Sequence, residues 1–227
     1  MKHQLKFLAV AVAAMLATAN VCAQTAGTWM LRAGATRLAP VGPSSCMSAP
    51  DYGDGSGCTR SNVSASTEPA GGVTYMYTDN LSVDVPLALP FKHDVIGAGS
   101  MQGAGKLGEV QALPVTVFVQ YRFFPADAKF RPYVGLGLTY AKFFKEQGSY
   151  HLTQTTNPGG PATTFTVDSK TILTPQIGAT LALNDKWFAD VFYSKAKLST
   201  TTHFSTGQTM GANLDPAAYG MAIGYKF

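Results

Sequence analysis

Long apolar runs are missing from most of this sequence. After residue 23 no stretch approaches the ~18 consecutive apolar residues that a membrane-spanning helix requires. A dense basic patch is missing too, because 17 Lys and Arg stand against 13 Asp and Glu. The protein is therefore not expected to bind nucleic acid. If the chain enters a membrane after residue 23, it must do so as a closed barrel, whose backbone groups are all paired.

Catalytic and metal-binding motifs are also absent. No G-x-S-x-G elbow is present, so the pairing of His93 and Asp94 with a serine gives no prediction of an enzyme. His93, His151 and His203 fall in or beside predicted loops, and no spacing such as H-x-E or H-x-x-x-H links them. We therefore expect solvated loop histidines, with no metal site and no cofactor.

The first 23 residues have the pattern of an export signal. Lys2 and Lys6 form a positive head, residues 7–16 form an apolar run, and Val21-Cys22-Ala23 precedes Gln24 as a cleavage site. The alternative, a lipoprotein acylated on Cys22, is disfavoured because Val21 stands where a small residue is expected. The prediction is a signal peptide over 1–23 and one barrel domain over 24–227.

Cysteine is scarce, with three residues in the chain. Removal of the signal leaves Cys46 and Cys58, and an even pair in an exported chain predicts a disulfide. The segment between them resembles a calcium loop only superficially, because Asp51 and Asp54 are out of step with D-x-D-x-D-G.

Alternation of apolar and polar residues with a period of two recurs along the chain after the signal, and it predicts β-strands. In the clearest strand, Leu81, Val83 and Val85 face one side while Ser82 and Asp84 face the other. Eight such segments are present, at about 29–38, 73–78, 81–91, 113–123, 133–144, 171–183, 187–198 and 217–227. An even number of antiparallel strands is typical of a barrel, either soluble or in a membrane.

The connections between these strands alternate strictly between short and long. The short ones, rich in Asn, Asp and Pro, are 78–80, 124–130 and 184–186, and the long ones are 39–72, 92–109, 145–170 and 199–216. All tight turns therefore lie at one end. Outer-membrane barrels have this layout, with short periplasmic turns and long external loops, whereas a soluble lipocalin-like barrel has no need of it. The sequence thus predicts an all-β, eight-stranded antiparallel transmembrane barrel in a bacterial outer membrane, in contact with its lipids.

Aromatic residues cluster toward the short-turn end, as an interfacial girdle would. They are Trp29, Tyr121, Phe123, Trp187, Tyr225 and Phe227.

Several motifs, in this order, resemble the OmpW family of outer-membrane proteins. They are LALPFKHDV (87–95), GKLGEVQALP (105–114), KFRPYVGLGLTY (129–140), LNDKWF (183–188), LDP (214–216) and GYKF (224–227). The resemblance implies an eight-stranded barrel whose hydrophobic lumen passes small hydrophobic compounds. The chain departs from the family at Lys170 and Ala217, where members often have Trp. The terminal Phe227 is expected to serve as a sorting signal for the barrel-assembly machinery, as in outer-membrane barrels generally.

The inward residues differ in polarity with depth. Charged ones fall near the short-turn end, and we expect them to pair and plug the lumen: Arg32, Asp84, Arg122, Asp190 and Lys226. Apolar ones lie nearer the loops or at mid-height and are expected to bind ligand: Leu38, Pro86, Ala88, Pro90, Ala112, Pro114, Phe118 and Phe192.

Three prolines suggest a route out of this upper lumen. Pro86, Pro90 and Pro114 cannot donate to the strand ladder, so the wall between the third and fourth strands is predicted to have a hydrogen-bond gap. The alternative is that they mark bulges above the membrane. The hypothesis is that a small hydrophobic solute enters from outside and leaves sideways into the bilayer. The rival function is a structural or adhesive barrel whose loops bind host ligands, phage or bacteriocins.

Overall fold

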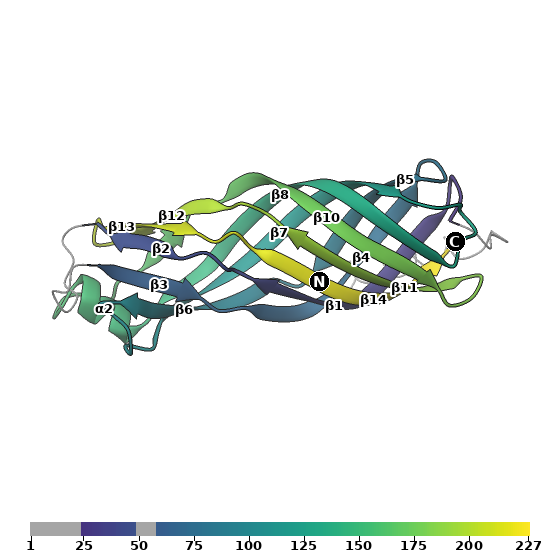
Figure 1. Ribbon diagram of the computed structural model, residues 1–227. Helices are drawn as coiled ribbons and strands as arrows, with labels where there is room; N and C mark the ends of the chain where they lie inside the picture. The colour runs from purple at the N-terminus through teal and green to yellow at the C-terminus, as the bar shows by residue number, and fades with distance from the viewer. Residues whose placement is uncertain (1–23, 49–57) are drawn as a thin grey trace, which may run out of the picture.

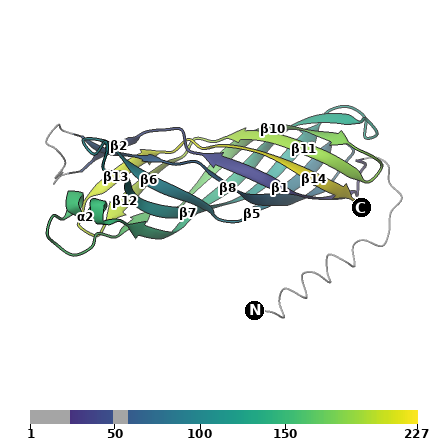
Figure 2. The same ribbon diagram turned by 90° about the horizontal axis from the view of Figure 1, so that it is seen from below.

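The computed structural model describes residues 24–48 and 58–227, and they form an elongated antiparallel β-barrel (Figures 1 and 2). Nine elements build the membrane wall and its continuations: β1 Trp29–Ala39, β4 Ser66–Met76, β5 Leu81–Ala88, β6 Phe91–Gly99, β7 Lys106–Arg122, β8 Phe130–Gly148, β10 Lys170–Ala182, β11 Trp187–Lys195 and β14 Ala217–Lys226. Beyond them lie β2 Ser44–Met47, β3 Thr59–Val63, α2 Tyr150–Thr156, β9 Phe165–Val167, β12 Ser199–Phe204 and β13 Thr209–Asn213.

The wall closes on itself, which confirms the predicted eight-stranded architecture. Around the wall the strands follow one another in the order β1, β4, β5, β7, β8, β10, β11 and β14. β6 follows β5 along the chain and pairs with the part of β7 nearer the collar. The last strand then pairs with the first, from Met30 opposite Lys226 to Ala39 opposite Ala217. The backbone N–H of Phe227 donates to the carbonyl of Trp29 at 2.8 Å, so the chain end completes the seam. A closed sheet leaves no edge unpaired in lipid.

The outer face of the wall is apolar, and the predicted alternation explains why. Val115, Val117 and Val119 on β7 are each about half exposed, whereas the intervening Thr116 and Phe118 are buried. Rings gather at the short-turn end, where Trp29 packs on Tyr75 and Trp187 packs on Tyr225, with centroids 4.8 and 5.1 Å apart. Rings at this level match an interfacial girdle. No helix among the described residues is long and apolar enough to cross a membrane.

In the described parts of the long connections much of the chain is strand rather than loop, which corrects the sequence interpretation. The strands continue past the apolar band as a collar, which we define as β2, β3, β6, β9, β12, β13, α2 and the adjoining ends of β7 and β8. The predicted second strand, for example, begins at Ser66 rather than at residue 73, and β8 runs to Gly148. Among these segments β2, β3, β12 and β13 are rich in Thr, Ser and Gly, so their apolar alternation was too weak to indicate strands.

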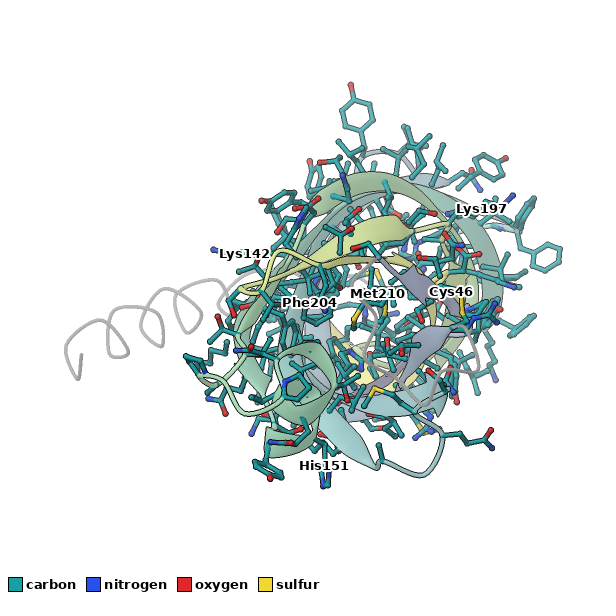
Figure 3. The ribbon with its side chains drawn as sticks, turned by 90° about the vertical axis from the view of Figure 1, so that its left-hand side faces the viewer. Cys46, Lys142, His151, Lys197, Phe204 and Met210 are labelled. Carbon is teal, nitrogen blue, oxygen red and sulfur yellow. A yellow bond between two sulfur atoms is a disulfide. The ribbon has the colours of Figure 1, made fainter. Side chains whose placement is uncertain are left out.

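The collar is built from two half-sheets. One consists of β3, β6, β7 and β8, and the other of β2, β13, β12 and β9. At one seam a disulfide joins Cys46 to Cys58, and the hydroxyl of Ser44 accepts a hydrogen bond from the backbone N–H of Ser61. Figure 3 looks into this end, where Met210 points toward the lumen and Lys142 and Lys197 point outward.

Candidate functional site

The inner floor of the barrel contains a buried ion pair. Arg32 on β1 donates from Nη1 and Nη2 to the two carboxylate oxygens of Asp84 on β5, at 2.6 and 2.9 Å. Thr74 of β4, which lies between them, accepts from Arg32 and donates to Asp84. Asp190 of β11 lies 3.7 Å from Nε of the same guanidinium. Two-point pairing of this kind holds the guanidinium in one orientation.

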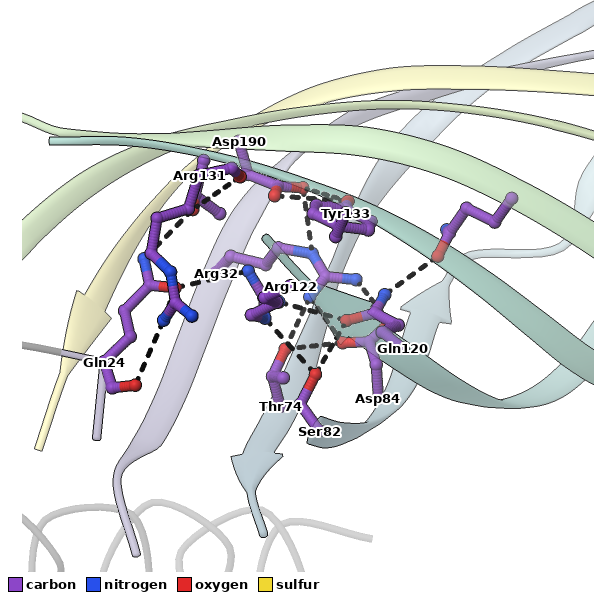
Figure 4. A network of polar contacts seen from close by, with 12 residues as sticks. Gln24, Arg32, Thr74, Ser82, Asp84, Gln120, Arg122, Arg131, Tyr133 and Asp190 are labelled. Carbon is purple, nitrogen blue, oxygen red and sulfur yellow. Dashed lines mark hydrogen bonds and ion pairs between the residues drawn. The ribbon is translucent and has the colours of Figure 1, made fainter. Parts of the chain in front are cut away.

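A second arginine is held by neutral groups. Arg122 is 1% exposed and donates to Ser82 and Gln120, and its guanidinium lies 4.8 Å from the centre of the Tyr133 ring. The Tyr133 hydroxyl in turn donates to Asp190. Because charges in a narrow lumen are costly when isolated, the pairing within this network stabilises the charged side chains of the floor (Figure 4).

The lowest layer of the floor was missed by the sequence analysis. Gln24 donates to Thr180 at 3.0 Å, and Arg131 donates to the backbone carbonyl of Gln24 at 3.1 Å. Arg131 is fully buried and also donates to the carbonyls of Asp79 and Phe124 in the periplasmic turns. A signal was present for Arg131, which occupies an inward position on its strand. Gln24 precedes the first strand, so the alternation said nothing about it.

The structure brings the predicted plug residues together at this floor. Arg32, Asp84, Arg122 and Asp190 form one connected network, and Lys226 is 4% exposed at the same end of the barrel. Glycines make room for the large rings of the lumen. A Cβ at Gly178 would lie 2.4 Å from the ring of Tyr133, and one at Gly137 would lie 2.6 Å from that of Phe118.

Above the floor lies a mostly apolar cavity of about 180 Å³. Seven of the eight predicted ligand-binding residues line it: Leu38, Pro86, Ala88, Ala112, Pro114, Phe118 and Phe192. Pro90 does not line it. A cavity of ~150 Å³ suffices to bind benzene, so this one has room for a small aromatic solute. Its upper end reaches Leu152, Phe204 and Met210 in the collar.

The wall beside this cavity is interrupted at the place where the prolines lie. β5 pairs with β7 as far as Asp84 opposite Phe118, and β6 resumes at Phe91 opposite Ala112. Between these points, residues 85–90 and 113–117 form no ladder with each other, although residues 85–88 keep their ladder with β4 and residues 113–117 keep theirs with β8. Six residues thus stand opposite five, and the ladder between the predicted third and fourth strands has a gap here.

At this interruption the cavity is bordered by two residues of the outward set, Leu87 and its ladder partner Gly71. Leu87 belongs to the outward set and is 55% exposed, yet it lines the cavity. A second interruption separates residues 170–175 from residues 195–198, but there the cavity is lined only by the inward set, such as Ile172 and Ala196. Lys195, on the outer face of that second site, is exposed.

The structure corrects the prediction for His93. It is not a solvated loop residue: it is 2% exposed, lies on β6 and lines the cavity, and its Nδ1 is 2.7 Å from the carbonyl oxygen of Ser64. His151 lies on α2, and His203 lies on β12 beside Asp168. Signal for His93 was available, because the alternation continues through Phe91, His93 and Val95 beyond Pro90.

A closed eight-stranded barrel with an apolar outer band, an aromatic girdle and turns gathered at one end defines an outer-membrane β-barrel protein. A family model described as "OmpW family" matches residues 25–227, so the chain belongs to the OmpW family. Its place is the bacterial outer membrane.

Relatives and solved structures agree with this assignment. The chain is 34% identical to outer membrane protein W of Vibrio cholerae serotype O1, over 96% of this chain and 97% of that one. It is 28% identical to outer membrane protein W of Escherichia coli K12, over 99% of both. The crystal structure of OprG from Pseudomonas aeruginosa matches with a TM-score of 0.79 and 25% identity, covering 92% of this chain and 99% of that one. The solid-state NMR structure of AlkL shares the fold, with a TM-score of 0.63 and 17% identity, covering 92% of this chain and 93% of that one.

Proposed function

We propose that this barrel conducts small hydrophobic molecules from the exterior into the outer membrane, and that it is not an enzyme. The observation that carries the proposal is the apolar cavity that extends into the collar above and borders the wall interruption. Burial of apolar area at ~25 cal/mol per Å² gives a small solute a modest affinity for the cavity. Modest affinity suits a conduit, because a solute that is held tightly does not leave.

The floor and the wall interruption together favour a sideways exit. Below the cavity, Arg32, Asp84, Arg122 and Asp190 would have to separate before a solute could reach the periplasmic end, and breaking such a buried network is costly. At the interruption no ladder hydrogen bonds have to break between residues 85–90 and 113–117. Leu87, which borders the cavity and is 55% exposed, would be the apolar side chain that a solute passes on its way to the lipid. The exposed Lys195 beside the second interruption makes that site the poorer exit.

The test is uptake of a small apolar solute by vesicles with a lipopolysaccharide outer leaflet that contain the refolded chain 24–227, with a small sugar as the control solute. A cavity-filling variant, Ala88→Trp, is compared with Leu136→Trp, which changes a 55% exposed side chain on the lipid face of β8. We expect faster entry of the apolar solute alone, loss of that entry in Ala88→Trp, and normal entry in Leu136→Trp.

Entry equal to that of empty vesicles, with folding confirmed by heat-modifiable gel mobility, would overturn the proposal. It would favour the adhesive alternative, in which the collar binds a partner. Besides the lipids of the membrane, we propose two kinds of partner for this chain. They are the small hydrophobic solutes and the barrel-assembly machinery.

A further inference from the structure

His93, which lines the cavity, makes a hydrogen bond whose direction the structure determines. The carbonyl oxygen of Ser64 can only accept, so Nδ1 of His93, 2.7 Å away, must carry a proton. In the neutral imidazole the other nitrogen, Nε2, is then an acceptor with a free lone pair.

Burial favours the neutral form of the His93 imidazole. Outward neighbours Lys92 and Asp94 are charged, and Lys106 pairs with Asp94, so β6 lies in the collar above the apolar band. Burial of the ring lowers the pKa of His93 from its ordinary 6.5, although the Ser64 carbonyl, Glu68 and Asp94 oppose this change.

Nε2 of His93 faces the cavity. Nε2 has no hydrogen-bond partner among the described residues. Among these residues, every side-chain nitrogen or oxygen that is fully buried does have a hydrogen-bond partner. Nε2 must therefore border open space, and the open space that His93 lines is the cavity. His93 also lies just beyond residues 85–90, so a solute entering from the collar meets Nε2 close to the wall interruption.

We propose that His93 makes the lumen selective for hydrophobic solutes that carry one hydrogen-bond donor, such as phenols, alcohols and aromatic N–H compounds. An apolar solute with a hydroxyl loses a hydrogen bond to water when it enters an apolar cavity, and Nε2 restores that bond. A solute of the same shape without a donor gains nothing from Nε2. This inference rests on the proposed conduit and names its substrate class.

The experiment compares phenol with anisole, its methyl ether, for binding to the chain 24–227 in nanodiscs. The measured quantity is the ratio of the two affinities in the wild type, in His93→Phe and in His93→Gln, whose amide can still donate to Ser64 and accept from a solute. His203→Phe, on the exposed collar strand β12, is the matched control. Heat-modifiable gel mobility checks the folding of each variant.

We expect the preference for phenol to fall ~5-fold in His93→Phe, as for the loss of one neutral hydrogen bond, and to be kept in His203→Phe. It should be restored in part in His93→Gln. In ¹⁵N-histidine spectra of the wild type, Nε2 of His93 should be unprotonated and should shift with phenol but not with anisole.

A protonated Nε2 in the wild type, or the same ratio in the wild type and His93→Phe, would overturn this inference and leave the conduit standing. Failure of the wild type to bind either solute would overturn both.

Discussion

Arg32 and Asp84, 52 residues apart in the chain, meet inside the barrel in a two-point ion pair with distances of 2.6 and 2.9 Å. Asp84 has no exposed surface and Arg32 has very little. Removal of either partner leaves the other charge in a confined space with few alternatives. The pair therefore links the stability of the barrel to the sealing of its lumen.

Asp84→Ala should weaken both properties. The free energy of unfolding in urea should fall by ~3–5 kcal/mol, because Arg32 keeps only the more distant Asp190. Conductance to small ions in planar bilayers should rise, and Arg122→Ala should raise it as well. Asp185→Ala, in an exposed periplasmic turn, is the control and should change neither quantity. Conductance at the wild-type level in a folded Asp84→Ala barrel would show that the floor does not seal the lumen.

The stability of the barrel should depend on pH through His93. Its pKa in the folded state is below the ordinary 6.5 because burial disfavours the imidazolium. Above pH 6.5 the ring is neutral in both states, whereas below it the unfolded chain binds the proton first, so stability falls as the pH decreases toward the folded pKa. The slope due to one group is at most ~1.4 kcal/mol per pH unit. Urea titrations between pH 8 and 5 should show a smaller loss for His93→Phe than for the wild type; equal losses would contradict the assignment.

The disulfide between Cys46 and Cys58 should hold the seam between the two half-sheets of the collar. β2 and β3 share no strand ladder, and the Arg60 side chain lies next to Cys58, with Nε 3.0 Å from Sγ. Cys46→Ser should therefore make trypsin cleave after Arg60, while the wild type resists. Cleavage after Arg122, which is buried in the floor and precedes Phe123, serves as the internal control and should occur in neither protein. Equal resistance at Arg60 would mean that packing alone closes the seam.

The terminal Phe227 should matter for assembly more than for stability. Its backbone closes the seam with Trp29, but its ring lies at the end of the girdle, packed on Tyr225 with centroids 5.0 Å apart. Phe227→Ala keeps the backbone bond, so the protein should refold in detergent as the wild type does. In cells the amount in the outer membrane should drop, if the ring is read by the assembly machinery. Normal membrane amounts would remove that role; Tyr219→Ala, an exposed ring elsewhere on β14, is the control.

The membrane part of the fold was readable from the sequence because two constraints act on it together. Lipid outside and a narrow lumen inside impose a period of two, and this period by itself assigns Arg32, Asp84 and Asp190 to the inner face. Above the lipid the outer constraint disappears. Thr200 and Thr202 face inward on β12 without an apolar contrast outside, and the strand there went unrecognised.

Contacts between distant segments were the other limit. Nothing local to Gln24 indicates that it caps Thr180, or that Arg131 reaches the carbonyl of Asp79. Which residues meet depends on the register, that is, on how far each strand is shifted along the next. The register is set by the closure of the whole barrel and therefore cannot be derived from a local stretch of sequence. The wall interruption was predictable for the opposite reason, since a missing N–H is a property of each proline by itself.

The proposed sideways exit has a consequence for what drives flux. On that proposal, a solute in the cavity would have the medium on one side and the hydrocarbon on the other, so the step out of the barrel would be a partition between two phases. Its rate should then rise with the oil–water partition coefficient of the solute, and removal of the solute from the membrane by downstream processes, rather than any energy source at the barrel, would determine the direction of net movement.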